Sequence, residues 1–340
     1  MSVVASDRSK VLVTGATGAV GPRVVQALHD AGFRVRTLSL DDPPAGLLPD
    51  GVEVCRGDVT DPVAVGAAMQ GIEAVVHMAA LLHIASPRPP AALRDQYERI
   101  NVGGTATVVD AAVKAGVKRL VLFSTIAVYG NTVGQILTED SPPQPDTFYA
   151  QTKLAAERIA LGARRSDGQP LGTVLRFAAI YGSRIKGNYQ RLLQSLARGT
   201  FIPIGDGRNR RTLIFDRDAA NAAVAAVRHP AAAGRIFNVS DGQFHALSEI
   251  IAAMCDALGR TPSRLSLPVA PIRFAAGLLE DAARIVGRQS PIVRATIDKY
   301  TEDVAVDGRR IQTQLGFVPQ YDLATGWRET VREMRQMGEL

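Results

Sequence analysis

The chain is poor in aromatic residues and in cysteine. Phe, Trp and Tyr make up 5% of its 340 residues, which favours close packing of helices on a sheet over an aromatic-rich β-sandwich. Only Cys55 and Cys255 are present, and they form no CxxC pair. We therefore expect two buried thiols in a reducing cytosol. The five histidines form neither an HExxH nor an HxH motif, so no protein-bound metal is expected.

Long apolar segments and clustered basic charge are also missing. No run of about 18 uncharged apolar residues occurs, and residues 1–10 lack the apolar stretch of a signal peptide. These absences predict a cytoplasmic protein without a transmembrane segment. The net charge is +6, from 39 basic and 33 acidic residues. Because the basic residues are scattered and not interleaved with aromatics, we do not expect nucleic acid as a partner.

Short apolar runs alternate with helical stretches through the first half of the chain. We predict strands at residues 11–14, 34–38, 52–55, 74–78 and 119–123, and a long helix at about 90–115. Strands that alternate with helices form βαβ units, and hence a parallel sheet with right-handed crossovers. The predicted fold class is α/β, a Rossmann-type doubly wound parallel sheet with a smaller, mostly helical C-terminal lobe.

A glycine-rich turn follows the first predicted strand. In the segment VLVTGATGAVG, Gly15 allows a tight turn, Gly18 leaves room for a pyrophosphate, and Gly21 lets the helix pack closely on the sheet. Backbone amides at the start of that helix would face the phosphates. This glycine spacing between a strand and a helix predicts a dinucleotide site.

The positions that would bind the ribose and the adenine are less decisive. An acid is expected at the end of the second strand, about 20 residues further on, but Ser39 occupies that position. Without the acid, NAD and NADP both stay open. Asp58 follows the third strand, where it either accepts a hydrogen bond from the adenine amino group or closes a turn.

Tyr149 and Lys153 are four residues apart in the segment YAQTK, so a helix would present them on one face. A neighbouring ammonium and a positively charged nicotinamide both favour the phenolate. Lowering the pKa of a phenol from about 10 to about 7 requires about 4 kcal/mol, and a charge pair in a partly dry site can supply much of it. Ser124 and Thr125 end the fifth strand, at the carboxyl edge of the sheet where such folds bind ligands.

The segments TGATGAVG, GDVTD, VHMAA, RINVGGT, STIAVYG, YAQTK and LRFAAIYG together resemble the extended short-chain dehydrogenase/reductase family, of the NAD-dependent epimerase/dehydratase type, over nearly the whole chain. The resemblance implies that Tyr149 is the acid/base, that Lys153 holds the nicotinamide ribose, and that Thr125 hydrogen-bonds the sugar oxygen, a role Ser124 can share. Asn101 is implied to support the active site; the alternative is a polar residue at a helix kink. The implied cofactor-binding residues are Gly15, Thr17, Gly18, Ala19, Val20, Gly21, Ser39, Asp58, Val59, Ala79, Ala80, Tyr149 and Lys153.

The chain is expected to divide into two parts. Residues 1–178 would form an NAD(P)-binding Rossmann domain, joined by a returning segment at about 213–240, and residues 179–340 a substrate-binding lobe. The elements predicted in the second half are helices at 189–198, 218–227, 247–258, 268–286 and 323–337, and a strand at 236–239. Residues 268–288 alternate apolar stretches with arginines. We prefer packing in the lobe or at a subunit contact for this segment, and binding to a membrane surface is the alternative.

The second half resembles the sugar-modifying members of the family from surface-polysaccharide pathways. Its segments RIKGN and IPIGDGRNRRT contain the implied substrate residues Lys186, Asn188 and Arg211, of which Arg211 best matches the arginine that meets a nucleotide diphosphate. Asn188 alternatively caps a helix. Ala179 replaces an asparagine common in the family, which removes one contact to the substrate. The resemblance also implies a homodimer formed through helices at about 90–115 and 149–165.

The resemblance leaves two reactions open. The first is epimerisation of a nucleotide sugar or diphosphate-linked sugar at carbon 4 through a transient 4-keto sugar, with NAD as the cofactor and NADP not excluded. The second is reduction of a keto-deoxy sugar nucleotide by NAD(P)H. Ile126 and Ala127 stand where 4,6-dehydratases carry Asp and Glu, which disfavours dehydration. A steroid-type or 3-hydroxy-acid dehydrogenase and a non-catalytic cofactor sensor are weaker alternatives.

Overall fold

Seven parallel strands form the central sheet. The structure, a computed structural model, describes residues 9–82, 89–131, 134–263, 265–285 and 294–340. The strand order is β11-β7-β5-β4-β1-β2-β3. These strands are β1 (Lys10–Thr14), β2 (Arg34–Ser39), β3 (Glu53–Arg56), β4 (Ala74–His77), β5 (Arg119–Thr125), β7 (Gly172–Phe177) and β11 (Ile236–Val239). The direction of winding reverses between β1 and β4, which is where a doubly wound sheet binds its ligands.

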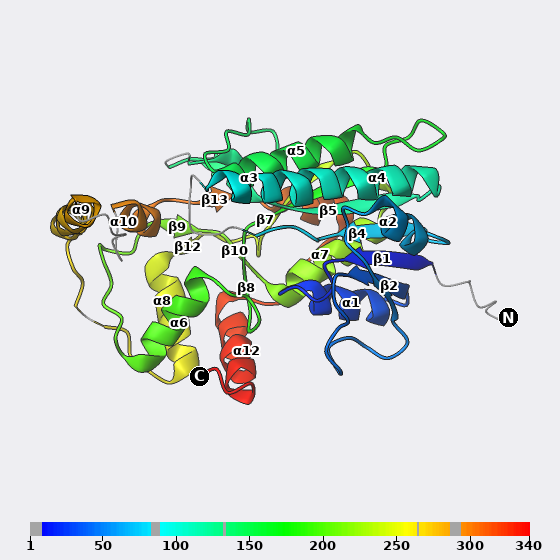
Figure 1. Cartoon of the computed structure of the whole chain (residues 1–340). Coiled ribbons are helices and arrows are strands. Elements are labelled where there is room, and N and C mark those ends of the chain that lie inside the picture. The colour runs from blue at the N-terminus through cyan, green and yellow to red at the C-terminus, as the bar shows by residue number, and fades with distance from the viewer. Residues whose placement is uncertain (1–8, 83–88, 132–133, 264, 286–293) are drawn as a thin grey trace.

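Helices cover both faces of the sheet, which explains why its strands are apolar on both sides. One face packs against α1 (Gly21–Asp30), α7 (Asp216–Arg228) and α11 (Arg309–Leu315), and the other against α2 (Pro62–Ala68), α4 (Gly104–Lys114) and α5 (Phe148–Gly162). In Figure 1, α4 and α5 lie above the sheet and α1 lies below it. Along β1, Val11 and Val13 pack in the core on the side of α1, and Leu12 packs in the core on the side of α4 and α5. The predicted Rossmann-type fold class is confirmed.

Each of the five strands predicted in the first half is present, with ends within two residues of the prediction, and β11 matches its prediction at both ends. The sequence does not predict β7, because its apolar run is interrupted by Arg176. In the structure this arginine is buried and paired with Glu157. β11 pairs in parallel with β7 and completes the sheet from the second half of the chain.

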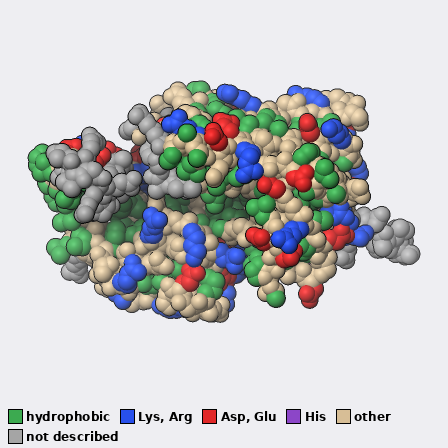
Figure 2. Space-filling view, viewed as in Figure 1, with side chains coloured by type: hydrophobic (Ala, Val, Ile, Leu, Met, Phe, Trp, Pro, Cys, Tyr) green, Lys and Arg blue, Asp and Glu red, His purple; other side chains and the backbone are tan. Residues whose placement is uncertain are grey.

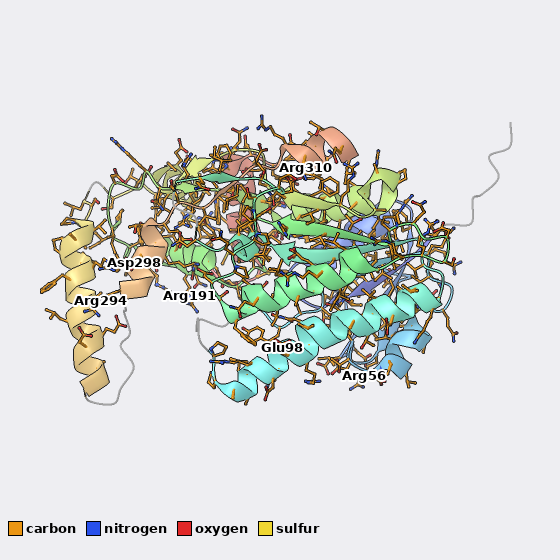
Figure 3. All side chains as sticks on the ribbon, turned by 90° about the horizontal axis from the view of Figure 1, so that it is seen from above. Arg56, Glu98, Arg191, Arg294, Asp298 and Arg310 are labelled. Carbon is orange, nitrogen blue, oxygen red and sulfur yellow. The ribbon has the colours of Figure 1, made fainter. Side chains whose placement is uncertain are left out.

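The long helix predicted at about 90–115 is interrupted. It consists of α3 (Ala91–Tyr97), a π-helical turn η1 (Glu98–Gly103), and α4. Gly104 follows the turn, and a Cβ there would lie 2.9 Å from Cγ2 of Val59, so the helix packs unusually closely on the segment after β3. The view from above shows α3 and α4 running alongside α5, with Glu98 at the interruption (Figure 3). Single π-helical turns of this kind often occur at functional sites.

The second half builds a separate apolar core below the carboxyl edge of the sheet. It is formed by α6 (Asn188–Arg198), α8 (Leu247–Leu258) and α12 (Leu323–Gln336). Trp327 stacks on Tyr181 with ring centroids 4.4 Å apart. The helices predicted at 189–198, 247–258 and 323–337 are confirmed to within one residue at each end. Three two-stranded pairs accompany this core: β8 (Ala179–Tyr181) with β10 (Leu213–Phe215), β9 (Arg210–Arg211) with β12 (His245–Ala246), and β6 (Ile136–Leu137) with β13 (Ala305–Val306).

Two further helices, α9 (Val269–Ile285) and α10 (Arg294–Thr301), lie at the far end of the molecule (Figure 1). α9 leaves large apolar side chains exposed, with Phe274 69% and Leu278 57% accessible. Hydrophobic side chains are visible at this end in the space-filling view (Figure 2). Residues 286–288, the end of the segment for which membrane binding was the alternative, lie outside the described residues. None of the helices in the described ranges combines the length and the apolar character needed to cross a bilayer.

Candidate active site

The glycine-rich turn lies between β1 and α1 and needs its glycines for different reasons. Gly15 has φ +75°, and a Cβ there would lie 2.8 Å from the backbone nitrogen of Ala79. A Cβ on Gly21 would lie 2.3 Å from the carbonyl oxygen of Ala16. Gly18 is exposed, and its Cβ would meet only the carbonyl oxygen of Gly15, at 3.1 Å. Gly15 and Gly21 are therefore required by the fold, whereas Gly18 keeps the outer surface of the turn bare.

The start of α1 suits an anion. Val20 occupies the N-cap and provides no side-chain cap, and Pro22 stands in the first turn. The backbone amides at this end are therefore available to a phosphate, as the sequence predicts. The remaining predicted cofactor positions lie at the same edge of the sheet: Thr17 and Ala19 in the turn, Ser39 at the end of β2, Asp58 and Val59 after β3, and Ala79 and Ala80 after β4.

The end of β2 also suits a ribose. The hydroxyls of Ser39 and Thr37 are buried and have no hydrogen-bond partner among the described residues. Asp58 is half-buried; one carboxylate oxygen accepts a hydrogen bond of 2.9 Å from the amide of Thr60, and the other lies 3.6 Å from Arg99. Asp58 thus closes a turn, the alternative that the sequence left open, while its position stays compatible with adenine recognition. Together, the uncapped start of α1 and the Ser39 hydroxyl at the end of β2 fit a dinucleotide.

His77, at the end of β4, connects three elements, and the sequence analysis did not identify it. One ring nitrogen lies 2.7 Å from the hydroxyl of Thr14 on β1, and the other lies 3.1 Å from the hydroxyl of Thr105 on α4. Burial, with a smaller contribution from the charge of Lys153, lowers the pKa of His77 to about 3. A neutral imidazole therefore links β1 and β4, between which the winding direction of the sheet reverses, to α4.

Helix α5 presents the tyrosine and the lysine. The hydroxyl of Thr147 caps the helix by accepting from the amide of Ala150 at 3.2 Å. Tyr149 lies in the first turn, with its ring in edge contact with the ring of Tyr97 at 6.3 Å. Lys153 lies one turn later and is buried, and its Nζ donates a 2.6 Å hydrogen bond to the carbonyl oxygen of Phe123 on β5. The bond fixes the ammonium two residues before Thr125.

Burial moves both groups toward their neutral forms. Burial, with a smaller contribution from nearby Tyr97, raises the pKa of Tyr149 to about 12. It lowers the pKa of Lys153 to about 8, against the opposing effect of the Glu157 carboxylate. Forming the phenolate near pH 7 therefore requires more compensation than the 4 kcal/mol expected from the sequence, about 7 kcal/mol. A positive charge beside the phenol is needed to supply it.

The two hydroxyls at the end of β5 have different surroundings. Thr125 is half-buried and caps the 3-10 helix η2 (Ile126–Tyr129), accepting a hydrogen bond of 3.1 Å from the amide of Ala127. Ser124 is buried and donates a 2.5 Å hydrogen bond to Oε1 of Glu157. The structure therefore engages Ser124 inside the protein and leaves Thr125 as the residue nearer to the surface.

Asn101 lies in the π-helical turn, buried, with each polar atom of its side chain in use. Its Oδ1 accepts from the amide of Leu81 at 2.7 Å, and its Nδ2 donates to the carbonyl oxygen of Leu81 at 3.2 Å and to the hydroxyl of Thr152 at 3.1 Å. These bonds join the turn to the segment after β4 and to α5, between Tyr149 and Lys153.

A buried ion pair, which the sequence analysis also missed, lies behind Lys153. Glu157 and Arg176 are 1% and 2% exposed, and Nη2 of Arg176 lies 2.7 Å from Oε2 of Glu157. Two signals for it exist in the sequence. Glu157 follows Lys153 by four residues, on the same helix face, and Arg176 interrupts an otherwise apolar strand.

The predicted substrate residues do not all come together. Lys186 and Asn188 line a pocket of about 230 Å³ between the segment after β8, α6 and α12, together with Tyr181 and Trp327. Lys186 is 70% exposed and pairs with Glu339 at 3.1 Å. The N-cap of α6 is Gly187, so the alternative interpretation, in which Asn188 caps this helix, is wrong.

Arg211 lies outside the lining of that pocket. It is on β9, and its Nη2 donates hydrogen bonds of 2.7 Å and 3.1 Å to the carbonyl oxygens of Lys299 and Tyr300. It therefore attaches α10 to the lobe. In the portion of the chain that is described, no three His, Cys, Asp or Glu side chains gather as a metal site would require.

Known proteins provide an independent comparison. The model of the NAD dependent epimerase/dehydratase family matches residues 11–240. The dTDP-glucose 4,6-dehydratase of Streptomyces griseus is 32% identical over 94% of this chain and 92% of its own length. The N-acetyl-alpha-D-glucosaminyl-diphospho-ditrans,octacis-undecaprenol 4-epimerase of Escherichia coli O157:H7 is 26% identical over 95% of this chain and 94% of its own length. The solved structure of MoeE5 in complex with UDP-glucose and NAD is 27% identical, with a TM-score of 0.74 and coverage of 97% and 99% of the two chains.

Proposed function

The chain belongs to the NAD-dependent epimerase/dehydratase family, within the extended short-chain dehydrogenases/reductases, and on that premise we propose that it epimerises carbon 4 of a sugar carried on a diphosphate. The cofactor of the family is NAD. The observation that carries the proposal is the hydrogen bond from Lys153 to the Phe123 carbonyl, which fixes an ammonium one helical turn from Tyr149 and beside the strand end that bears Thr125.

One set of residues would bind the dinucleotide, and Tyr149 would transfer the proton. The bare end of α1, Ser39 and Asp58 would hold the dinucleotide, which when bound supplies a hydride acceptor that also returns the hydride. Tyr149 Oη takes the proton of the 4-hydroxyl as the carbon–hydrogen bond breaks, which leaves a 4-keto sugar. Once the ketone has turned over in the site and been reduced on its opposite face, Tyr149 Oη would give the proton back to the oxygen at carbon 4.

Lys153 and Thr125 prepare this proton transfer. The ammonium of Lys153 lowers the cost of the phenolate, which is large because burial raises the pKa of Tyr149 to about 12. The hydroxyl of Thr125 would donate to the sugar oxygen and hold it beside the phenol. Because Ser124 already donates to Glu157, we assign this role to Thr125 alone.

Dehydration is disfavoured by the two residues that come directly after Thr125. Ile126 and Ala127 begin η2 and provide neither an acid nor a base. Elimination of water across carbons 5 and 6 needs both.

The substrate and the assembly are extensions of the same proposal. Lys186 and Asn188 share a pocket between the segment after β8, α6 and α12, and we assign the diphosphate-linked part of the substrate to this pocket. The name of the Escherichia coli relative supports a lipid diphosphate as the carrier, and the UDP-glucose in the MoeE5 structure supports a nucleotide.

We further expect a homodimer formed through α3–α4 and α5, which size-exclusion chromatography with light scattering would test.

One observation favours a second function. β2 ends at Ser39 and presents no acid, which would allow the 2′-phosphate of NADPH and hence net reduction of a 4-keto sugar by the same residues. Incubation of the purified protein with a panel of nucleotide sugars, with and without NADPH, separates the two. Interconversion of 4-epimers without added cofactor supports the epimerase, and stoichiometric NADPH consumption supports the reductase. Near-normal activity of Tyr149→Phe in either assay would refute the assigned chemistry.

A further inference from the structure

The ion pair behind Lys153 is more extensive than a single contact. Nε of Arg176 donates to Oε1 and Oε2 of Glu157 at 3.0 and 3.1 Å, and Nη2 donates to Oε2 at 2.7 Å. Burying a pair of charges costs desolvation that their attraction only partly offsets, so such a pair is weak evidence for stability. Its position relative to Lys153 suggests another role.

Glu157 contacts the end of β5 and is one helical turn from Lys153. The hydroxyl of Ser124 donates to Oε1 of the carboxylate at 2.5 Å. Nζ of Lys153 donates to the carbonyl oxygen of Phe123, the residue before Ser124. The carboxylate and the ammonium therefore hold consecutive residues of the same strand end, immediately before Thr125.

Arg176 is itself fixed from the other side. Its guanidinium lies over the ring of Tyr129 on η2, 4.8 Å from the centroid. The hydroxyl of Tyr129 donates a hydrogen bond of 2.8 Å to Oδ1 of Asn238 on β11. Buried side chains of η2 and β11 thus fix the orientation of Arg176, and Arg176 in turn fixes the carboxylate of Glu157.

We propose that Glu157 and Arg176 are positioning residues of the active site: Arg176 fixes the Glu157 carboxylate where its negative charge keeps Lys153 protonated and its oxygen keeps the Ser124 hydroxyl away from the substrate. The inference rests on the role assigned to Lys153 in the proposed function. It adds an outer layer to that site, in which neither residue touches the substrate.

The other charged and titratable groups around Lys153 do not provide this negative charge. Tyr149, one turn earlier on α5, is neutral in the free protein, because burial raises its pKa to about 12. His77 on β4 is neutral as well, because burial lowers its pKa to about 3. Arg176 on β7 is a cation paired with Glu157, so it does not supply a negative charge either. Burial lowers the pKa of Lys153 to about 8, and Glu157 is the group that raises it.

The test removes both charges at once, since Glu157→Gln alone would leave a buried arginine unpaired. The variant is Glu157→Gln with Arg176→Met in the full chain, because apolar replacement of a buried pair is often tolerated. The readout is the pH dependence of acetic anhydride labelling of Lys153 in the cofactor-free protein, measured by mass spectrometry. We expect the labelling midpoint to fall by at least one pH unit, and the alkaline limb of kcat to move with it at unchanged KM. A folded variant with the wild-type midpoint would overturn the proposal.

Glu157→Asp provides a second test that retains the charge. It withdraws the carboxylate from Ser124 and Lys153, so the midpoint should fall by less than in the double variant; an unchanged midpoint would count against the proposal. The matched control replaces the Arg36–Glu53 pair between β2 and β3 by Glu53→Gln with Arg36→Met, which should leave the labelling of Lys153 unaltered. An active Tyr149→Phe would refute the proposed function. If Tyr149→Phe is inactive but the double variant at Glu157 and Arg176 keeps the wild-type labelling midpoint of Lys153, only the positioning role is refuted.

Discussion

The side-chain amide of Asn101 donates a hydrogen bond of 3.1 Å to the hydroxyl of Thr152, which joins the π-helical turn to α5 between Tyr149 and Lys153. The same side chain forms two bonds to Leu81, beyond the end of β4. One buried amide therefore sets the distance between the helix that carries the phenol and the sheet edge that would hold the cofactor. A regular α-helix through residues 98–103 would rotate Asn101 away from both partners.

Replacing Asn101 by Ala should reduce both stability and turnover. The variant leaves the amide and carbonyl of Leu81 without their partner, and each buried polar group left unsatisfied costs about 1–3 kcal/mol. We expect the free energy of unfolding in urea to fall by about 2–4 kcal/mol, and kcat to fall because α5 loses an attachment. Thr152→Val removes one of these three bonds and the 2.9 Å bond from its own hydroxyl to the carbonyl oxygen of Tyr149, but it leaves Leu81 paired and should cost less. Equal stability of Asn101→Ala and wild type would contradict the assignment.

Lys153 should affect stability in a pH-dependent manner. Burial lowers its pKa to about 8 in the folded protein, while an unfolded lysine titrates near 10.5. Between these values the unfolded chain binds more protons, so the contribution of Lys153 to the free energy of unfolding rises with pH. Wild type should therefore gain stability relative to Lys153→Met between pH 8 and pH 10, in urea titrations at both values. Lys118→Met provides the control variant, because it removes an exposed lysine that is paired with Glu73.

The sequence predicts most of the sheet and the helix that carries Tyr149 and Lys153 because their signals are local. Apolar runs mark the strands, glycine spacing marks the phosphate turn, and a four-residue interval places Tyr149 and Lys153 on one face. The residues that the sequence misses act over long distances. His77 connects Thr14 with Thr105, and Glu157 pairs with Arg176, so their partners can be identified only once the chain has folded.

The different surroundings of Ser124 and Thr125 have the same origin. Adjacent residues of a strand point to opposite faces, so Ser124 and Thr125 cannot both face the substrate. The sequence does not say which of them turns inward, because that depends on the burial of Glu157 on a different element. The π-helical turn is likewise unpredictable from local propensity, since the close contact between Gly104 and Val59 depends on tertiary packing.

Two glycines of the phosphate turn should respond differently to alanine. Gly21→Ala places a Cβ 2.3 Å from a backbone oxygen, so this variant should unfold at markedly lower temperature. Gly18→Ala meets only the carbonyl oxygen of Gly15 at 3.1 Å and should fold nearly normally, but its Cβ would obstruct the phosphates and weaken NAD binding at least tenfold. Thermal unfolding and fluorescence titration with NAD measure the two effects. Gly66→Ala in α2, where the Cβ meets nothing within 4 Å, should instead stabilise by about 0.5–1 kcal/mol. A strong loss of stability in Gly18→Ala would show that the turn needs this glycine for folding.

Ser39 should control the choice between the two cofactors. Ser39→Asp introduces a carboxylate at the end of β2, which accepts from a ribose 2′-hydroxyl and repels a 2′-phosphate. We expect NADP binding to weaken at least tenfold relative to NAD, measured as dissociation constants by fluorescence titration. Ser39→Ala is the matched control and should leave stability unchanged, because the hydroxyl has no partner among the residues described. Equal effects of Ser39→Asp on both cofactors would place the 2′ position elsewhere.

A charged cluster between α1 and the lobe should give the protein a characteristic pH response. Arg23 on α1 donates to Asp216 at 3.2 Å and to Glu333 on α12 at 2.5 Å. Burial raises the pKa of Asp216 to about 6, and Gly182 adjoins its carboxylate so closely that a Cβ there would lie 2.5 Å away. For Glu333, burial raises the pKa, but the hydrogen bonds from Ser183, Arg23 and Arg217 outweigh it and lower the pKa below its usual value.

Asp216→Asn and Glu333→Gln should therefore change the pH dependence of stability with opposite signs. The raised pKa of Asp216 gives a contribution that is present below the unfolded pKa, near 4, and is lost as the pH rises through about 6. Asp216→Asn should therefore gain on wild type between pH 4 and pH 7.5, by about 2–3 kcal/mol at most. The lowered pKa of Glu333 gives a contribution that is complete above pH 5 and is lost on acidification, so Glu333→Gln should lose less stability than wild type below pH 4.5. Urea unfolding across pH 4 to 7.5 measures both. Parallel stability curves for wild type and Asp216→Asn would mean that Asp216 titrates alike in the folded and unfolded chains. Its burial against Gly182 would then not raise the pKa of the carboxyl group.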